Sequence, residues 1–112
     1  MTETGAIEVY HAHVYFDEGG VDSARDLCEA ADGHFDITMG RVHEKPVGPH
    51  PRWSCQLAFA PSEFARVIPW LALNRGGHTV FIHPETGDAL TDHTDHAMWM
   101  GEMIALNLDI FR

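Results

Sequence analysis

Positively charged side chains are scarce in this sequence. It holds seven Lys and Arg against seventeen Asp and Glu, so its formal net charge is −10 with histidine neutral. A surface this acidic repels phosphate backbones and anionic lipid headgroups. We therefore expect no nucleic acid and no membrane surface among the partners of the protein.

The sequence also lacks long apolar runs and the pattern of a signal peptide, and it has few cysteines. No stretch approaches the roughly 18 consecutive apolar residues of a membrane span. Met1–Glu8 has neither the basic nor the apolar region of a signal peptide. The two cysteines, Cys28 and Cys55, each lie inside an apolar pattern. We interpret them as buried thiols in a reducing compartment, and we expect a cytoplasmic location.

Several motifs of enzymes are absent too. The sequence has no glycine-rich phosphate loop, no GxSxG and no CxxC. Nucleotide binding, serine hydrolysis and thiol redox chemistry are therefore unsupported. The 112 residues, of which 45% are hydrophobic, suit a single domain over 1–112 with a core of its own. What the chain does hold in excess is histidine. Its nine histidines are dispersed, unlike a tag, and histidine is the commonest metal ligand.

Apolar periodicity predicts the secondary structure. Strands are expected at 8–16, 35–42, 53–60 and 78–83, and helices at 21–33 and 61–74. Gly33 is expected to end the first helix, and Pro69 to kink or restart the second. Residues 43–52 form a rigid proline-rich loop, and Pro84 with Gly87–Asp88 a turn. A short helix capped by Thr91 or Asp92 and a terminal strand over 106–110 complete the prediction.

The order β-α-β-β-α-β predicts an α+β fold of the ferredoxin-like βαββαβ type. In this sandwich two helices cover one face of an antiparallel sheet. The first strand would then lie between the third and the fourth. By alternation, Tyr10, Ala12, Val14 and Phe16 face the helices, while the intervening side chains face away from them.

Three histidines are expected on the face turned away from the helices. His11 and His13 are two residues apart on one strand, and His83 has the matching parity on the neighbouring strand. Ser54 and Gln56 would border them. Imidazole nitrogens that converge from adjacent strands can hold one metal ion. The alternative is a structural or cross-strand pairing role for the HxH pair.

Two further polar clusters are candidates for function. The first is the proline-stiffened segment Arg41–Pro51, in which Glu44 would serve a site of two histidines and one carboxylate. The alternative there is a solvated polar loop. The second is Asp92–His96, where His93 and His96 share a helical face. We favour capping and a structural role for this second cluster over a second metal site.

Five segments of the chain resemble the DOPA 4,5-dioxygenase family of fungi and bacteria. They are YHAHVYF (10–16), GRVHEKPVGPHP (40–51), PWLALNRGG (69–77), HPETGD (83–88) and DHTDHAMWMG (92–101). The resemblance implies a ferredoxin-like, usually dimeric protein that cleaves a catechol ring in the extradiol manner with Fe(II) and O2. The histidines of the family fall at His11, His13, His43, His50 and His83. His78 departs from the usual pattern, which is apolar at this position.

The resulting hypothesis is an Fe(II)-dependent extradiol dioxygenase that acts on a catechol such as DOPA, as a homodimer. Iron would be held by His11 or His13, by His83, and by a third ligand, His50 or Glu44. Zn or Ni could replace iron in a purified sample. His43 or His50 would be the general acid, and Arg41 would bind a substrate carboxylate. The rival hypothesis is a non-catalytic ferredoxin-like dimer that binds a metal or a small aromatic ligand.

Overall fold

A computed structural model describes residues 7–112 of the chain. The prediction that Met1–Glu8 lacks a signal peptide concerns residues that lie almost wholly outside this range. Among the described residues, no helix has both the length and the apolar character that a membrane crossing requires.

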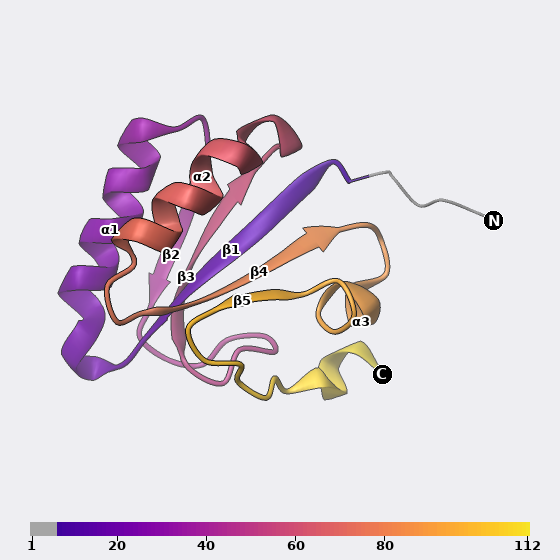
Figure 1. Cartoon of the computed structure of the whole chain (residues 1–112). Helices are drawn as coiled ribbons and strands as arrows, with labels where there is room; N and C mark the ends of the chain where they lie inside the picture. Colours follow the sequence, from indigo (N-terminus) through magenta and orange to yellow (C-terminus); the bar gives the residue numbers. More distant parts are fainter. Residues whose placement is uncertain (1–6) are drawn as a thin grey trace.

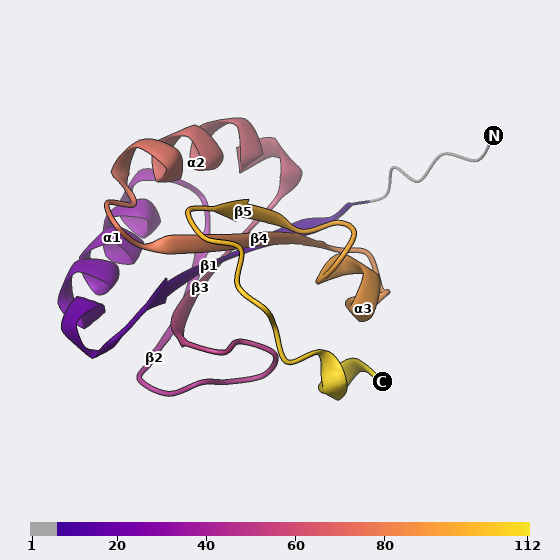
Figure 2. The ribbon, with the colours of Figure 1, turned by 60° about the horizontal axis from the view of Figure 1, so that its bottom comes forward.

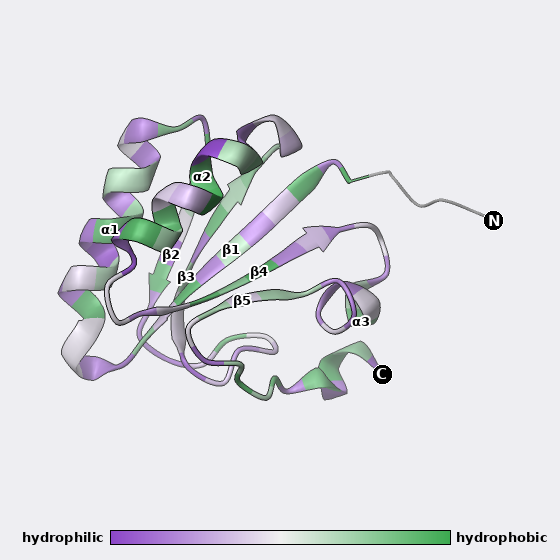
Figure 3. Ribbon diagram, in the orientation of Figure 1, coloured by the Kyte–Doolittle hydropathy of each residue, from purple (hydrophilic) through white to green (hydrophobic). Residues whose placement is uncertain are grey.

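The described residues form a five-stranded antiparallel sheet in the order β2-β3-β1-β4-β5 (Figure 1). The strands are β1 (Val9–Phe16), β2 (Thr38–His43), β3 (Trp53–Phe59), β4 (Thr79–Glu85) and β5 (Met98–Met100). β1 pairs with β3 on one side and with β4 on the other, as predicted. Green and purple bands alternate along β1 in Figure 3, because successive side chains point to opposite faces.

Two long helices cover one face of this sheet. They are α1 (Val21–His34) and α2 (Pro61–Asn74), and Figure 2 shows both on the same side of the strands. Each buries a stripe at helical spacing against the even-numbered side chains of β1, such as Ala12 and Val14. The stripes consist of Ala24, Leu27, Cys28 and Ala31 on α1, and of Val67 and Leu71 with the partly buried Phe64 and Ile68 on α2. The predicted ferredoxin-like α+β sandwich is therefore confirmed.

The structure corrects the prediction for Gly33 and excludes one of the two alternatives for Pro69, the restart of the helix. α1 continues through Gly33 and is capped by Phe35, whose backbone N–H donates to the Ala31 carbonyl. α2 does not restart at Pro69 but runs unbroken through it. Pro69 is exposed, so water can reach the carbonyl of Ala65, which loses its intrahelical partner.

The last quarter of the chain differs most from the prediction. Residues 89–92 form the short helix α3 (Ala89–Asp92), which begins before Thr91 and is capped by Asp88. β5 follows α3, was not expected from the sequence, and pairs with β4 over Val80–Ile82. No strand forms over 106–110, where the 3-10 helix η2 (Leu108–Phe111) lies instead. A second 3-10 helix, η1 (Glu18–Gly20), precedes α1.

Pro84 lies inside β4 and not in a turn. It stands opposite Tyr10 of β1. Proline is tolerated in a strand where its missing N–H faces no partner strand. The pairing with β5 covers only Val80–Ile82, so beyond Ile82 the second side of β4 is an edge.

A β-bulge in β2 changes the facing of its side chains. The register with β3 shifts between Met39 and Val42, which stand opposite Leu57 and Cys55. Both therefore face the helices, although strict alternation would separate positions 39 and 42. The bulge consequently turns His43, opposite Ser54, to the same face as Tyr15.

Candidate metal centre

Three histidine side chains converge on the sheet face opposite the helices. His11, His13 and His83 each offer one nitrogen, and these three nitrogens all lie within 4.8 Å of one another. His11 and His83 stand directly opposite each other on β1 and β4, and His13 follows two residues along β1. We call these three residues the histidine site. Their convergence agrees with the expectation from the sequence that all three side chains lie on the same face of the sheet.

Hydrogen bonds to protein oxygens orient two of these rings. His83 Nδ1 lies 2.9 Å from the Pro84 carbonyl, to which it donates. His11 Nδ1 lies 3.1 Å from Glu85 Oε1. Both interactions engage Nδ1 and leave Nε2 for the site. Metal-binding histidines are commonly oriented by such partners on the far ring nitrogen.

Burial favours the neutral form of these imidazoles. His83 is 1% exposed and His13 is 4% exposed. Loss of hydration lowers the pKa of His13 well below its ordinary value, and neighbouring histidines lower it further. Burial lowers the pKa of His83 to about 4, although the Pro84 hydrogen bond acts in the opposite direction. Burial also lowers the pKa of His11, against the attraction of Glu85.

The donor set fits a single transition-metal ion. His13 Nε2 and His83 Nε2 are 3.0 Å apart. Two nitrogens that each lie about 2.1 Å from one ion, at right angles, are also about 3.0 Å apart. Without an ion, His13 Nε2–H donates to His83 Nε2. With one, His13 would carry its proton on Nδ1. Imidazole ligands suit iron, zinc, copper and nickel, so the donor set does not identify the metal.

His50 and Tyr15 form a second pair beside the histidine site. The Tyr15 hydroxyl lies 2.6 Å from His50 Nδ1, and both side chains are buried. The His50 ring lies 4.1 Å from the His13 ring between centroids. Burial lowers the pKa of His50 to about 4 and raises the pKa of Tyr15. A neutral imidazole and a protonated phenol thus share a short hydrogen bond.

The remaining predicted residues are not brought into the histidine site. Arg41 and Glu44 are exposed at the end of β2 and in the loop that follows. Glu44 is not part of the group of possible metal ligands found among residues 7–112. His43 is half-buried and shares the histidine face through its pairing with Ser54. The roles predicted for these three residues therefore stay predictions.

Sequence reasoning missed the position of His93. Its ring lies 4.0 Å from the His83 ring and 4.5 Å from the Phe111 ring between centroids. His93 Nδ1 bonds to the Ala89 carbonyl, so its Nε2 is free to face the site. The spacing of His93 and His96 suggested a shared face. Instead, His96 bonds to Asp92 and lines a different pocket.

Aromatic side chains surround the histidines. Phe81 stacks on Trp99, and their ring centroids are 4.6 Å apart. Phe81 also lies 5.4 Å from His83 between centroids. The C-terminal segment closes over this side, where the Asn107 backbone N–H donates to the Pro49 carbonyl next to His50. Figure 2 shows this segment and the loop between β2 and β3 on the side away from the helices. The surroundings thus suit an aromatic ligand.

Comparison with known proteins gives the relationships of the chain. Residues 10–110 match the Dopa 4,5-dioxygenase family. The chain is 36% identical over 112 residues to a protein of Amanita muscaria named DOPA 4,5-dioxygenase, covering 91% of this chain and 49% of that protein. It is 35% identical over 117 residues to an uncharacterized 21.2 kDa protein of Botryotinia fuckeliana, covering 96% and 64% respectively. The chain thus spans between about half and about two thirds of the length of these relatives.

A solved structure shares both the fold and much of the sequence. It is the crystal structure of a Nostoc punctiforme protein described as a candidate dioxygenase, with a TM-score of 0.90 and 46% identity. The match covers 92% of this chain and 90% of that chain. The family match and the relative named DOPA 4,5-dioxygenase confirm the resemblance noted in the sequence. The chain belongs to the DOPA 4,5-dioxygenase family.

Proposed function

We propose that the protein is a non-haem Fe(II)-dependent extradiol dioxygenase that cleaves the ring of a catechol such as DOPA. The observation that carries the proposal is the convergence of His11, His13 and His83 within 4.8 Å. Family membership supports the dioxygenase class. The reaction breaks a ring carbon–carbon bond next to one hydroxyl group and inserts both atoms of O2.

The histidine site would hold the iron. Iron bound there would supply the Lewis-acid and redox chemistry that joins a catechol to O2. The protein contributes orientation, because Glu85 and the Pro84 carbonyl fix which nitrogens of His11 and His83 face the site. The aromatic wall of Phe81 and Trp99 excludes water from the side of His83.

His50 and Tyr15 would handle the proton. A catechol must lose a proton on binding, and the ring-opened product must gain one, so a proton carrier is required next to the site. His50 packs against the His13 ring and shares a 2.6 Å hydrogen bond with the Tyr15 hydroxyl. This contact favours His50 over His43 as the general acid and base. Tyr15 positions His50 and does not itself touch the substrate in this scheme.

Arg41 is proposed to bind the carboxylate of the substrate. Its guanidinium is exposed beside the loop that carries His50, and a bidentate contact with a carboxylate suits arginine. Arg41→Ala should raise KM for carboxylated catechols much more than for catechol itself. Arg52→Ala is the matched comparison, because Arg52 is also exposed but already lies near Glu102. Equal effects of Arg41→Ala on both substrate types would contradict the assignment.

Oxygen uptake tests the proposed function. The full chain is loaded with Fe(II) without O2 and is then mixed with air-saturated buffer and a panel of catechols. We expect O2 uptake together with a yellow ring-opened semialdehyde. His83→Ala should abolish both the O2 uptake and the semialdehyde product. In the same assay, Glu44→Gln should lower both only if Glu44 is a ligand of the metal. Bound iron without any product would favour the non-catalytic binding module. Light scattering during size-exclusion chromatography tests the proposed homodimer.

A further inference from the structure

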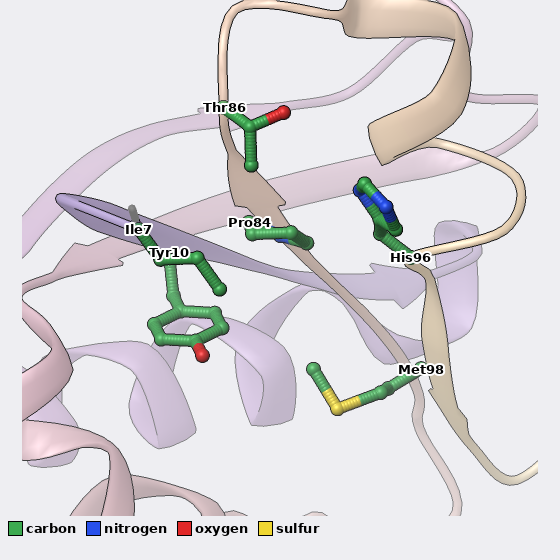
Figure 4. Close-up of a pocket in the computed structure, with 6 residues that line it drawn as sticks. All are labelled: Ile7, Tyr10, Pro84, Thr86, His96 and Met98. Atoms are coloured by element: carbon green, nitrogen blue, oxygen red, sulfur yellow. The ribbon is translucent and has the colours of Figure 1, made fainter. Parts of the chain in front are cut away.

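A second pocket lies on the opposite face of the sheet from the histidine site. It has a volume of about 260 Å³ and is lined by Ile7, Tyr10, Pro84, Thr86, His96 and Met98 (Figure 4). Tyr10 stands opposite Pro84, and Met98 stands opposite Ile82. These side chains therefore share the helix-bearing face. α1 packs on β1, β2 and β3, and α2 packs on β1. Met98 at this end of β5 is 37% exposed.

The buried carboxylate of Asp92 orients His96, a polar side chain of this pocket. Asp92, 1% exposed, accepts hydrogen bonds from the Thr86 backbone N–H at 2.7 Å and from the Thr86 hydroxyl at 2.8 Å. It also lies 2.9 Å from His96 Nδ1. Since Nδ1 is engaged with Asp92, the nitrogen that His96 can offer to a ligand is Nε2. The contact with Asp92 thus fixes the ring of the half-exposed His96 at the edge of the apolar pocket.

We propose that this pocket binds a small neutral phenol, separately from the histidine site. The ring of Tyr10, the thioether of Met98 and the ring of Pro84 offer apolar contacts to one aromatic ring. His96 Nε2 offers one hydrogen bond, and a phenolic hydroxyl can either donate to it or accept from it. Asp92 behind His96 disfavours a carboxylated ligand in this pocket.

Neither the metal nor the proposed reaction enters this inference. None of His11, His13 and His83 lines the pocket, and the side chains of the two sites leave opposite faces of β1 and β4. Loss of phenol binding would therefore leave the dioxygenase proposal intact, and loss of activity would leave the phenol site intact.

Methyl NMR of the full chain with 13C-labelled methionine methyl groups tests the proposal. The probes are 4-methylphenol and toluene, which differ by one hydroxyl group. We expect the Met98 signal to shift saturably with 4-methylphenol while that of Met39, packed in the core, stays in place. Binding of 4-methylphenol should be about threefold to tenfold tighter than that of toluene, the effect of one hydrogen bond.

Two variants complete the test. His96→Phe should bind both probes equally, and Met98→Trp, which fills the pocket from a partly exposed position on β5, should bind neither. Because Met98→Trp lacks the Met98 signal, its binding is followed through the NMR signals of the two probes themselves. Thermal unfolding confirms that each variant is folded, and Met98→Trp alone decides if His96→Phe is not. The proposal is overturned if neither probe shifts the Met98 signal. It is also overturned if His96→Phe still binds 4-methylphenol more tightly than toluene. It is also overturned if the signal shifts with protein concentration alone, because the pocket is then a contact between two copies.

Discussion

At the residue scale, Glu85 is the outer partner that orients His11. Its carboxylate lies 3.1 Å from His11 Nδ1 and 3.9 Å from His83 Nδ1. Removing such a partner typically weakens metal affinity by about 10- to 100-fold. We expect Glu85→Ala to do so in an anaerobic Fe(II) titration. Glu29→Ala, which removes an exposed carboxylate on α1, should leave the affinity unchanged. Equal affinities of the two variants would show that Glu85 has no orienting role.

Tyr15 offers a second residue-scale prediction. Tyr15→Phe removes the hydroxyl that lies 2.6 Å from His50 Nδ1 and keeps the buried ring. We expect unchanged iron binding and a kcat at least roughly tenfold lower, since proton transfer through a positioned group contributes about 100-fold or more. Steady-state O2 uptake and iron titration measure the two quantities. A parallel fall in iron binding would indicate a structural role, and an unchanged kcat would remove Tyr15 from the mechanism.

Single residues also show what the sequence could and could not predict about the site. The histidine site followed from parity, because a strand alternates its side chains and His11, His13 and His83 lie on paired strands. His93 had no such signal. It reaches His83 because the segment after β4 folds back, which local periodicity does not encode.

At the scale of elements, two glycines should respond oppositely to the same substitution. Gly101 follows β5 with a φ of +88°, and an added Cβ would lie 3.1 Å from Arg75 Nη1 and from Thr79 Oγ1. Gly101→Ala should cost about 1–2 kcal/mol of unfolding free energy through backbone strain alone. Gly33 is helical, and no atom lies within 4 Å of its added Cβ. Gly33→Ala should therefore stabilise by about 0.4–1 kcal/mol. Urea unfolding measures both, and changes of equal sign would contradict this account.

The turn between β4 and α3 should make stability depend on pH. Burial alone would raise the pKa of Asp92, but hydrogen bonds from Thr86 and His96 outweigh it and leave the pKa lowered. A carboxyl group whose pKa is lower in the folded state stabilises the fold at every pH above its unfolded pKa of about 3.9. This stabilisation is lost as the pH falls through the folded-state pKa. Asp92→Asn should thus cost about 1–3 kcal/mol at pH 6, and less at a pH below the folded pKa. A pH-independent difference in urea unfolding would contradict this origin.

The elements that the sequence predicted well are those with a long, clean period. β1, α1, β3 and α2 agree with their predicted positions to within about one or two residues. β5 was missed because its three residues, Met98–Met100, are too few to show a period. The bulge between Met39 and Val42 was missed because it interrupts the alternation that defines a strand. Gly40 allows close approach, since an added Cβ would lie 3.3 Å from the Gln56 carbonyl oxygen.

At the scale of the whole molecule, the sheet separates two kinds of environment. One face packs against α1 and α2 and forms the core. The other face gathers histidines and aromatic rings. The loop between β2 and β3 and the C-terminal segment lie on this second side (Figure 2). The ferredoxin-like order of elements was readable from the sequence. The closing of the second face by residues 101–112 was not, because it depends on contacts such as Asn107 with Pro49.

The central claim is that His11, His13 and His83 hold one iron ion. A crystal structure of the full chain loaded with Fe(II) without O2, with anomalous data collected at the iron edge, tests it most directly. We expect one anomalous peak within bonding distance, about 2.1 Å, of one nitrogen from each of the three histidines. A peak held by His96 and Asp92, or by other residues without His83, would contradict it.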